Sequence, residues 1–167
     1  MFRKMRRFKQ MLSEEESIDI LRRGTSGVLA LTGDDGYPYA VPLSYVYRNG
    51  KIIFHGAKAG HKIDAINQSG KASFCVIDKD DVVPEKYTTY FRSVIAFGNV
   101  HILDDDSEKR SAVDKLAEKY RPNFSEERNQ EIDREFPQLC VFELDIEHMT
   151  GKEAIELVRA KMKSEKP

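Results

Sequence analysis

The sequence has only two cysteines, Cys75 and Cys140, and no long uncharged apolar run. Two thiols are too few for a disulfide framework or a cysteine-based zinc site, which is typical of proteins in a reducing compartment. No apolar stretch approaches the roughly 20 residues that a membrane-spanning helix needs. The first residues, MFRKMRRFKQML, lack the apolar run of a secretion signal. We therefore expect a cytoplasmic protein with no membrane partner.

Charge of either sign is plentiful, but it is distributed unevenly. The 27 basic and 28 acidic residues nearly cancel, yet five of the basic residues and no acidic residue lie within residues 1–10. The rest of the chain therefore carries a net charge of −6. Because phosphate contacts dominate nucleic-acid binding, this acidic body argues against nucleic acid as a partner. We interpret residues 1–11 as a solvated basic tail, with a membrane surface or an acidic partner as the alternative.

Short apolar segments separated by tight turns dominate the middle of the sequence. Gly33–Gly36 and Asn49-Gly50 are hairpin signals, and the alternating segment 37–47 contains Pro38 and Pro42, which fit only an edge or bulged strand. A bend is expected at Gly98. Strands are predicted at 27–32, 37–47, 51–55, 71–77, about 89–103 and 139–146.

Helices are expected mainly toward the two ends of the chain. Ser13 and Glu16 form a capping-box pattern for a helix that stops at Gly24, and Ser107 is the expected N-cap of a later helix. Further helices are predicted at 61–68, 125–136 and about 152–163. Because strands and long helices do not alternate, a doubly wound α/β fold is excluded. We expect a single, mainly β domain over residues 1–167, an antiparallel barrel or sandwich with peripheral helices.

The segment that runs from Phe54 to Ile63, FHGAKAGHKI, is the most informative for chemistry. A strand ends in small residues, and a helix then begins at Gly60-His61-Lys62. Free amides at a helix start attract phosphate, and Lys62 and His61 would add a charge and a donor. The spacing is not that of a Walker A loop. A turn whose basic residues are merely solvated is the alternative.

Other catalytic and metal signals are weak. His55 ends a strand beside small residues and is a candidate polar group at the floor of a ligand slot. Near Pro42, Leu43, Ser44 and Tyr45, freed backbone donors could face a planar ligand. No His, Cys, Asp or Glu pair recurs with ligand spacing, so no metal site is predicted; the charged loop at 78–81 lacks calcium-loop spacing. No nucleophile elbow exists, and both cysteines lie in apolar strands where thiols are usually inert.

Taken together, these stretches resemble the pyridoxamine 5′-phosphate oxidase-like flavoproteins, and among them the 5-nitroimidazole-resistance (Nim) group. The resemblance covers about residues 12–155. Its five segments occur in the family's order, namely GVLALTGDDGYPYAVPLSYVY, KIIFHGAKAGHKIDAI, KASFCVI, TTYFRSVIAFGNVHIL and HMTGKEA.

The resemblance implies a split β-barrel homodimer that binds FMN at the subunit interface. His61 and Lys62, after Gly60, would hold the phosphate. The backbone of Pro42, Leu43, Ser44 and Tyr45 would line the isoalloxazine edge. Phe54, His55, Gly56 and Ala57 would run along the ring and the ribityl chain, while Arg92 and Ser93 would approach the flavin from another strand.

The function implied is that of an FMN-dependent oxidoreductase that reduces a nitroaromatic or similar small acceptor, with His55 as the catalytic residue. The sequence lacks tryptophan and ends in Lys- and Glu-rich residues. It therefore lacks the tryptophan- and arginine-bearing C-terminal segment of the vitamin B6 oxidases, which argues against that activity. Two alternatives remain: a flavin- or haem-binding carrier or sensor without turnover, and a dimeric structural domain without cofactor.

Overall fold

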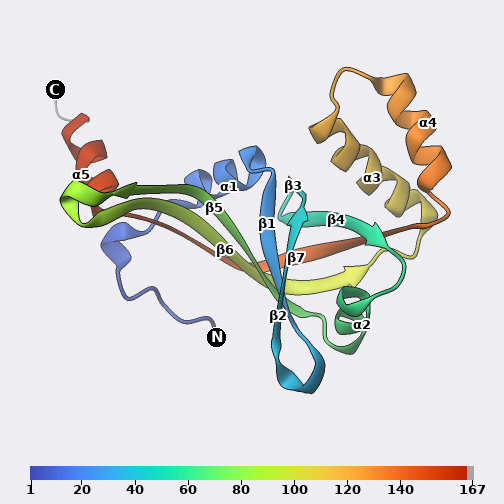
Figure 1. Ribbon diagram of the computed structural model, residues 1–167, viewed down its shortest axis with the longest axis horizontal. Coiled ribbons are helices and arrows are strands. Elements are labelled where there is room, and N and C mark those ends of the chain that lie inside the picture. Colours follow the sequence, from blue (N-terminus) through green and yellow to red (C-terminus); the bar gives the residue numbers. More distant parts are fainter. Residues whose placement is uncertain (165–167) are drawn as a thin grey trace.

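The computed structural model describes residues 1–164, which form one antiparallel sheet with helices around it (Figure 1). Short 3₁₀ turns lie at Phe8–Gln10, Asp34–Gly36 and Pro84–Lys86. The helices are α1 Glu14–Arg23, α2 His61–Gln68, α3 Asp106–Tyr120, α4 Ser125–Glu135 and α5 Ile155–Ser164. The strands are β1 Ser26–Thr32, β2 Pro38–Ser44, β3 Val46–Arg48, β4 Lys51–Ala57, β5 Lys71–Val83, β6 Thr88–Ile102 and β7 Leu139–Glu153.

The order of the strands shows that the sheet closes on itself. The order is β2-β1-β5-β6-β7-β4-β3, so β2 and β3 stand at opposite ends. Only Tyr45 separates these two strands along the chain. The sheet must therefore curl until its two ends meet, which gives the mainly β, antiparallel barrel that the sequence predicts.

Tyr45 holds this junction from both its side chain and its backbone. Its ring is fully buried and meets Phe74 edge to face, with 4.9 Å between the ring centroids. Its backbone N–H donates to the Tyr120 hydroxyl at 2.9 Å, and its carbonyl accepts from Lys119 Nζ at 3.0 Å. The C-terminal end of α3 is therefore fastened to the point where β2 becomes β3.

Two apolar clusters divide the molecule. The larger fills the barrel, with Phe54, Phe74 and Phe142 at its centre. The smaller packs α3 and α4 against the outer surface of β4 and β7, where Ile53 and Val141 are buried. The α3–α4 hairpin thus covers one part of the barrel's outside (Figure 1).

Another part of the outer surface is apolar and uncovered. One cross-strand row joins Val28 on β1, Cys75 on β5 and Ile95 on β6. Val28 and Ile95 are each 37% exposed, and Ile77 further along β5 is 66% exposed. We call Val28, Cys75, Ile77 and Ile95 the open face.

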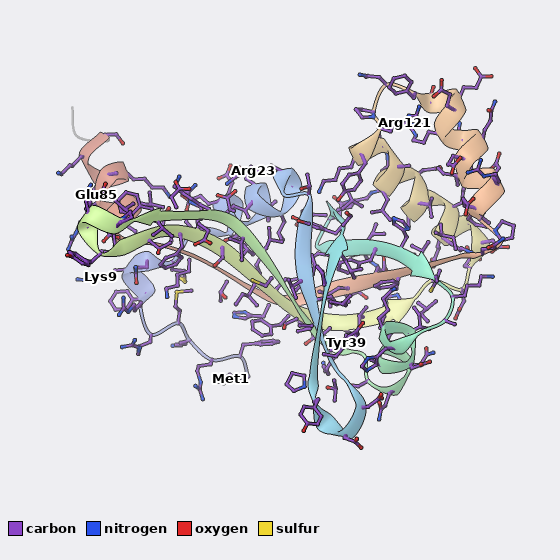
Figure 2. All side chains as sticks on the ribbon, viewed as in Figure 1. Met1, Lys9, Arg23, Tyr39, Glu85 and Arg121 are labelled. Atoms are coloured by element: carbon purple, nitrogen blue, oxygen red, sulfur yellow. The ribbon has the colours of Figure 1, made fainter. Side chains whose placement is uncertain are left out.

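The N-terminal segment lies against the barrel near both of its ends, through Phe2 and through a bridge between Met11 and Lys152 on β7. Figure 2 labels Met1 and Lys9 near its two ends. The Phe2 ring stacks on His148 with 4.6 Å between centroids, while the five basic side chains of the segment are exposed. In residues 1–164 no helix combines the length and apolar character needed to cross a membrane.

Most of the predicted elements are confirmed. The Ser13 capping box is present, and the predicted helix ends at Gly24. β2, with its two prolines, is an edge strand, and the β6–β7 register shifts at Gly98, where a Cβ would lie 1.8 Å from the Asp145 carbonyl oxygen.

Four predictions were wrong in detail. Asp105, not Ser107, caps α3, because its carboxylate accepts from the amides of Ser107 and Glu108. The predicted strand 37–47 is interrupted at Tyr45. The expected charged loop at 78–81 continues β5, and the last strand continues through HMTGKE, so the C-terminal helix begins only at Ile155. The extended parts of β5 and β7 are polar, so no apolar alternation in the sequence indicates them. Residues 165–167 of the predicted C-terminal segment lie outside the described part of the chain.

A pair of substitutions at Tyr45 tests the junction. Tyr45→Ala should lower the free energy of unfolding by about 3–5 kcal/mol, since it empties a large buried site. Tyr45→Phe should stay within about 1 kcal/mol of the wild type, because the buried hydroxyl finds no hydrogen-bond partner among residues 1–164. Urea unfolding measures both, and an Ala variant as stable as the Phe variant would contradict the account.

Candidate functional site

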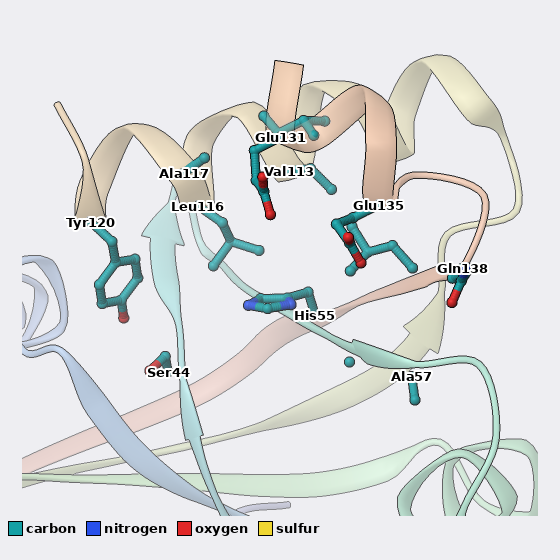
Figure 3. A pocket seen from close by; sticks show the side chains of 13 residues that line it. Ser44, His55, Ala57, Val113, Leu116, Ala117, Tyr120, Glu131, Glu135 and Gln138 are labelled. Carbon is teal, nitrogen blue, oxygen red and sulfur yellow. The ribbon is translucent and has the colours of Figure 1, made fainter. Parts of the chain in front are cut away.

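A cavity of about 690 Å³ opens between the end of β4 and the α3–α4 hairpin (Figure 3). Its floor is His55, Gly56 and Ala57, with Ser44 from the end of β2 beside them. Its size lies within the range of small-molecule sites. The roof and sides are formed by Val113, Leu116, Ala117, Tyr120, Glu131, Ile132, Glu135, Gln138 and Leu139.

His55 reaches the cavity because of strand alternation. Ile52 and Phe54 face the barrel core, so Ile53 and His55 face outward toward the helical hairpin. Figure 3 shows the imidazole beneath Leu116. Although His55 is exposed at the cavity, partial desolvation by the surrounding protein lowers the pKa of its imidazole below the ordinary value, and the nearby Lys62 charge lowers it further. The imidazole is therefore neutral at pH 7.

Lys62 lies on the other side of the same strand end. A Cβ built on Gly56 would lie 2.8 Å from Lys62 Cε and 3.0 Å from its Nζ. The ammonium group therefore occupies space that any larger residue at position 56 would take. Gly60, at φ +117°, turns the chain into α2 and so directs Lys62 toward β4. His55 and Lys62 thus flank the end of β4.

His61, the neighbour of Lys62, points elsewhere. Its ring stacks on Tyr39 with 4.0 Å between centroids, and its Nε2 lies 3.8 Å from a carboxylate oxygen of Asp34. An acidic neighbour disfavours an anion there. The structure therefore brings Lys62, and not His61, to the strand end beside His55.

The stretch from Pro42 to Tyr45 reaches the cavity only in part. Ser44 lines it, while Leu43 packs against the barrel core. The Tyr45 amide is already bonded to Tyr120, so it offers no free donor. Pro42 has no amide hydrogen. Of these four residues, Ser44 is the one that lines the cavity.

Phe54, Arg92 and Ser93 lie outside the cavity in this chain. Phe54 is fully buried and stacks on Phe142, so only its backbone follows β4 past the site. Arg92 is paired with Asp78 at 3.3 Å and with Glu153 at 2.9 Å, which ties β6 to its neighbours. Ser93 lies two residues before Ile95 on β6, so the two side chains are on the same side of the sheet and Ser93 belongs to the side of the open face.

Sequence reasoning missed the residues of the roof. Glu131 and Glu135 come from the segment 125–136, which reads only as a polar helix, and Gln138 follows it; the sequence predicts Tyr120 only as part of the apolar face of the preceding helix. The signal that could have found two of them is spacing: Glu131 and Glu135 are one helical turn apart and flank Ile132, the buried residue of α4.

A second cluster of ionisable groups is an ion-pair network. The ligand-type atoms of His101, Glu143 and Asp145 lie within 4.8 Å of one another. Lys51 donates to Glu143 and lies 3.1 Å from Asp145, so its ammonium is paired with both carboxylates. The two carboxylates of this cluster are therefore already bound to a lysine.

Comparison with solved structures places this fold among known ones. A candidate 5-nitroimidazole antibiotic resistance protein of Bacteroides thetaiotaomicron shares 22% identity over 86% of each chain, with a TM-score of 0.71. A FAD-binding protein of Mesorhizobium loti shares 23% identity over 87% of this chain and 97% of its own, with a TM-score of 0.63. A FAD- and haem-binding protein of Mycobacterium smegmatis shares 23% identity over 91% and 80%, with a TM-score of 0.73.

At these identities the likeness concerns the fold, which is therefore the split barrel that the sequence resemblance implied. None of the curated proteins matches the chain. The family model of pyridoxamine 5′-phosphate oxidase matches residues 13–153, which is most of the sequence. The chain belongs to the pyridoxamine 5′-phosphate oxidase family.

Proposed function

We propose that this protein binds FMN at the end of β4 and uses it to reduce a nitroaromatic or similar small acceptor. The observation that carries the proposal is the convergence of His55, Gly56 and Lys62. A neutral imidazole, a bare stretch of backbone and a lysine ammonium meet there beside a cavity of about 690 Å³. The two free thiols support a cytoplasmic setting.

The residues present fit the parts of FMN. The Lys62 ammonium, which lies in the space left by the missing side chain of Gly56, suits a phosphate bound at this strand end. The apolar roof suits a planar ring system. When bound and reduced by a nicotinamide or ferredoxin-type donor, FMN supplies the two electrons that, with two protons, convert a nitro group to a nitroso group and water.

His55 is the proposed proton donor to the acceptor. It is the one titratable imidazole of the cavity lining, and its ring lies under the roof where an acceptor would enter. Because its pKa is lowered, the fraction of the acid form grows only as the pH falls below the ordinary histidine range. We expect turnover to rise in the same direction.

The open face supports a homodimer with FMN at the subunit boundary. Val28, Ile77 and Ile95 form an apolar surface that is exposed to water in the single chain, as is typical of surfaces that bind a partner. By strand alternation Pro42, the cross-strand neighbour of Val28, shares this side with Ser44 at the cavity. A second copy on the open face would therefore border the cavity, and it would cover Ser93 as well.

A carrier or sensor is the alternative. The discriminating measurement is whether a nitro compound reoxidises the dithionite-reduced, FMN-loaded protein faster than oxygen alone does. Bound flavin without such reoxidation would favour the carrier.

Replacing Lys62 tests the phosphate site. Lys62→Ala should weaken FMN binding by about 1.5–3 kcal/mol, roughly tenfold or more in Kd, because one charge-assisted contact is lost. Fluorescence titration of free FMN measures it. The exposed Lys71→Ala makes the same charge change elsewhere and should bind as the wild type does. If Lys62→Ala binds FMN as tightly as the wild type does, Lys62 does not contact the phosphate.

Replacing His55 tests the proton donor. His55→Ala should retain FMN but reoxidise about a hundredfold more slowly with a nitro compound, the usual scale of a general acid. The wild-type rate should rise as the pH is lowered toward the depressed pKa of His55, and this rise should vanish in the variant. An anaerobic stopped-flow record of the flavin band follows both. A flavin-loaded variant with the wild-type rate and pH profile would exclude His55.

Replacing Ile95 tests the open face. Ile95→Lys should convert a dimer into a monomer and lower FMN retention, because the charge would be buried between copies. Met162→Lys changes an exposed apolar residue on α5 and should leave the dimer intact. Size-exclusion chromatography with light scattering reports whether each protein is a monomer or a dimer. A monomeric wild type, or an Ile95→Lys protein that remains dimeric, would contradict the proposed interface.

A further inference from the structure

We propose that residues 1–11 dock the protein on an anionic membrane surface, with the basic side chains at the lipid headgroups and Phe8 and Met11 in the interface. This docking segment is separate from the flavin site, so it does not depend on the proposed function. The sequence alone favours a solvated tail without a membrane partner, but the exposure of its apolar side chains favours the alternative. The attachment is peripheral, since no helix in residues 1–164 is long and apolar enough to span a membrane.

The positive charges of the docking segment are uncompensated. Residues 1–10 contain no acidic residue and five basic ones, namely Arg3, Lys4, Arg6, Arg7 and Lys9. All five side chains are exposed, and none forms an ion pair with another residue of the described range 1–164. The rest of the chain carries a net charge of −6. An anionic surface therefore attracts this segment and repels the body of the protein.

Apolar side chains are interleaved with these charges and stand in water. Phe8 is 67% exposed and Met11 is 55% exposed, while Met1 is fully exposed. Large apolar side chains among lysines and arginines are typical of segments that lie in a membrane interface. An acidic partner protein would need an apolar pocket matched to each of these side chains. A bilayer surface takes up both kinds of side chain without such a match.

The order of the residues also suits a helix that lies flat on a surface. Met1, Met5 and Phe8 follow the spacing i, i+4, i+7 and would share one side of a helix. Arg3 and Arg7, one turn apart, would lie on the opposite side. In the structure the segment contains only the 3₁₀ turn that begins at Phe8. We expect a longer helix to form on contact with lipid.

The docking segment is attached to the barrel at its C-terminal end. Gln10 and Leu12 are buried, and the Leu12 amide donates to the Gly151 carbonyl at 3.0 Å. The exposed side chains of Phe8 and Met11 lie directly beside this attachment to β7. A membrane bound through them would therefore hold the barrel in one orientation.

Helix α5 adds the same chemistry next to the docking segment. It packs beside Phe8–Gln10, and Figure 1 shows it at the end of the molecule away from α3 and α4. Its Lys161 pairs with the buried Glu153 at 2.7 Å, which fixes the helix on the barrel. Met162 and Lys163 are exposed on this helix. An apolar and a basic side chain from a distant part of the sequence thus join those of the docking segment.

Vesicle sedimentation tests the proposed surface on the whole protein. Vesicles of phosphatidylcholine with phosphatidylglycerol should bind the wild type about tenfold or more tightly than vesicles of phosphatidylcholine alone, and salt should reduce the preference. Arg6→Gln with Arg7→Gln should weaken binding about 25-fold, since each basic residue at an anionic surface contributes about fivefold. Arg121→Gln with Arg134→Gln removes two exposed arginines from the α3–α4 hairpin and should bind as the wild type does.

Three results would overturn the inference. The first is equal binding of the wild type to neutral and anionic vesicles. The second is binding by the Arg6 and Arg7 variant that matches the wild type. The third is binding to poly-glutamate without binding to the anionic vesicles, which would identify an acidic protein as the partner.

A tryptophan reporter tests whether the apolar side chains enter the interface. The sequence has no tryptophan, so Phe8→Trp introduces a single indole. Its emission should move to shorter wavelength when anionic vesicles are added, because the indole leaves water. Phe124→Trp, at an exposed phenylalanine before α4, should show no change. A shift at neither position, or at both, would contradict docking through residues 1–11. All substituted side chains are exposed, so folding should be retained, and thermal unfolding of each variant checks it.

Discussion

The whole architecture depends on one connection, the single residue by which the two ends of the sheet are joined. Since Tyr45 alone links β2 to β3, the seven-stranded sheet must form a barrel, and every strand end acquires a fixed position. The same residue is fastened to α3 by Tyr120 and Lys119. Closure of the barrel and placement of the helical hairpin are therefore linked through the same residue, and the cavity lies beneath the hairpin.

The cavity lies where two kinds of outer surface meet. On one side α3 and α4 cover β4 and β7, and on the other the open face of β1, β5 and β6 remains apolar and bare. His55 stands on the covered side, and Ser44 lies at the boundary. In the proposed function the strand end binds the phosphate, the hairpin covers the cavity that the acceptor enters, and a second copy completes the wall.

Local chemistry made much of the fold predictable, and long-range contacts limited the rest. The capping box at Ser13 and the prolines of β2 act within a few residues, so their consequences could be predicted correctly. The strand extension beyond Ile77 is polar and is held by pairing with β6, which no local pattern reveals. Likewise, His61 and Lys62 are adjacent but about 100° apart on a helix, so only the fold decides which one faces β4. The roof of the cavity depends on the packing of α4 over β4, far apart in sequence.

The central claim, that the strand end at His55 and Lys62 binds FMN, is tested most directly by a visible absorption spectrum. The purified protein is recorded as isolated, and again after incubation with FMN and desalting. The account predicts a retained flavin spectrum at about one FMN per chain. A colourless protein that releases all added FMN would contradict it, and a Soret band in its place would show that haem is the group bound.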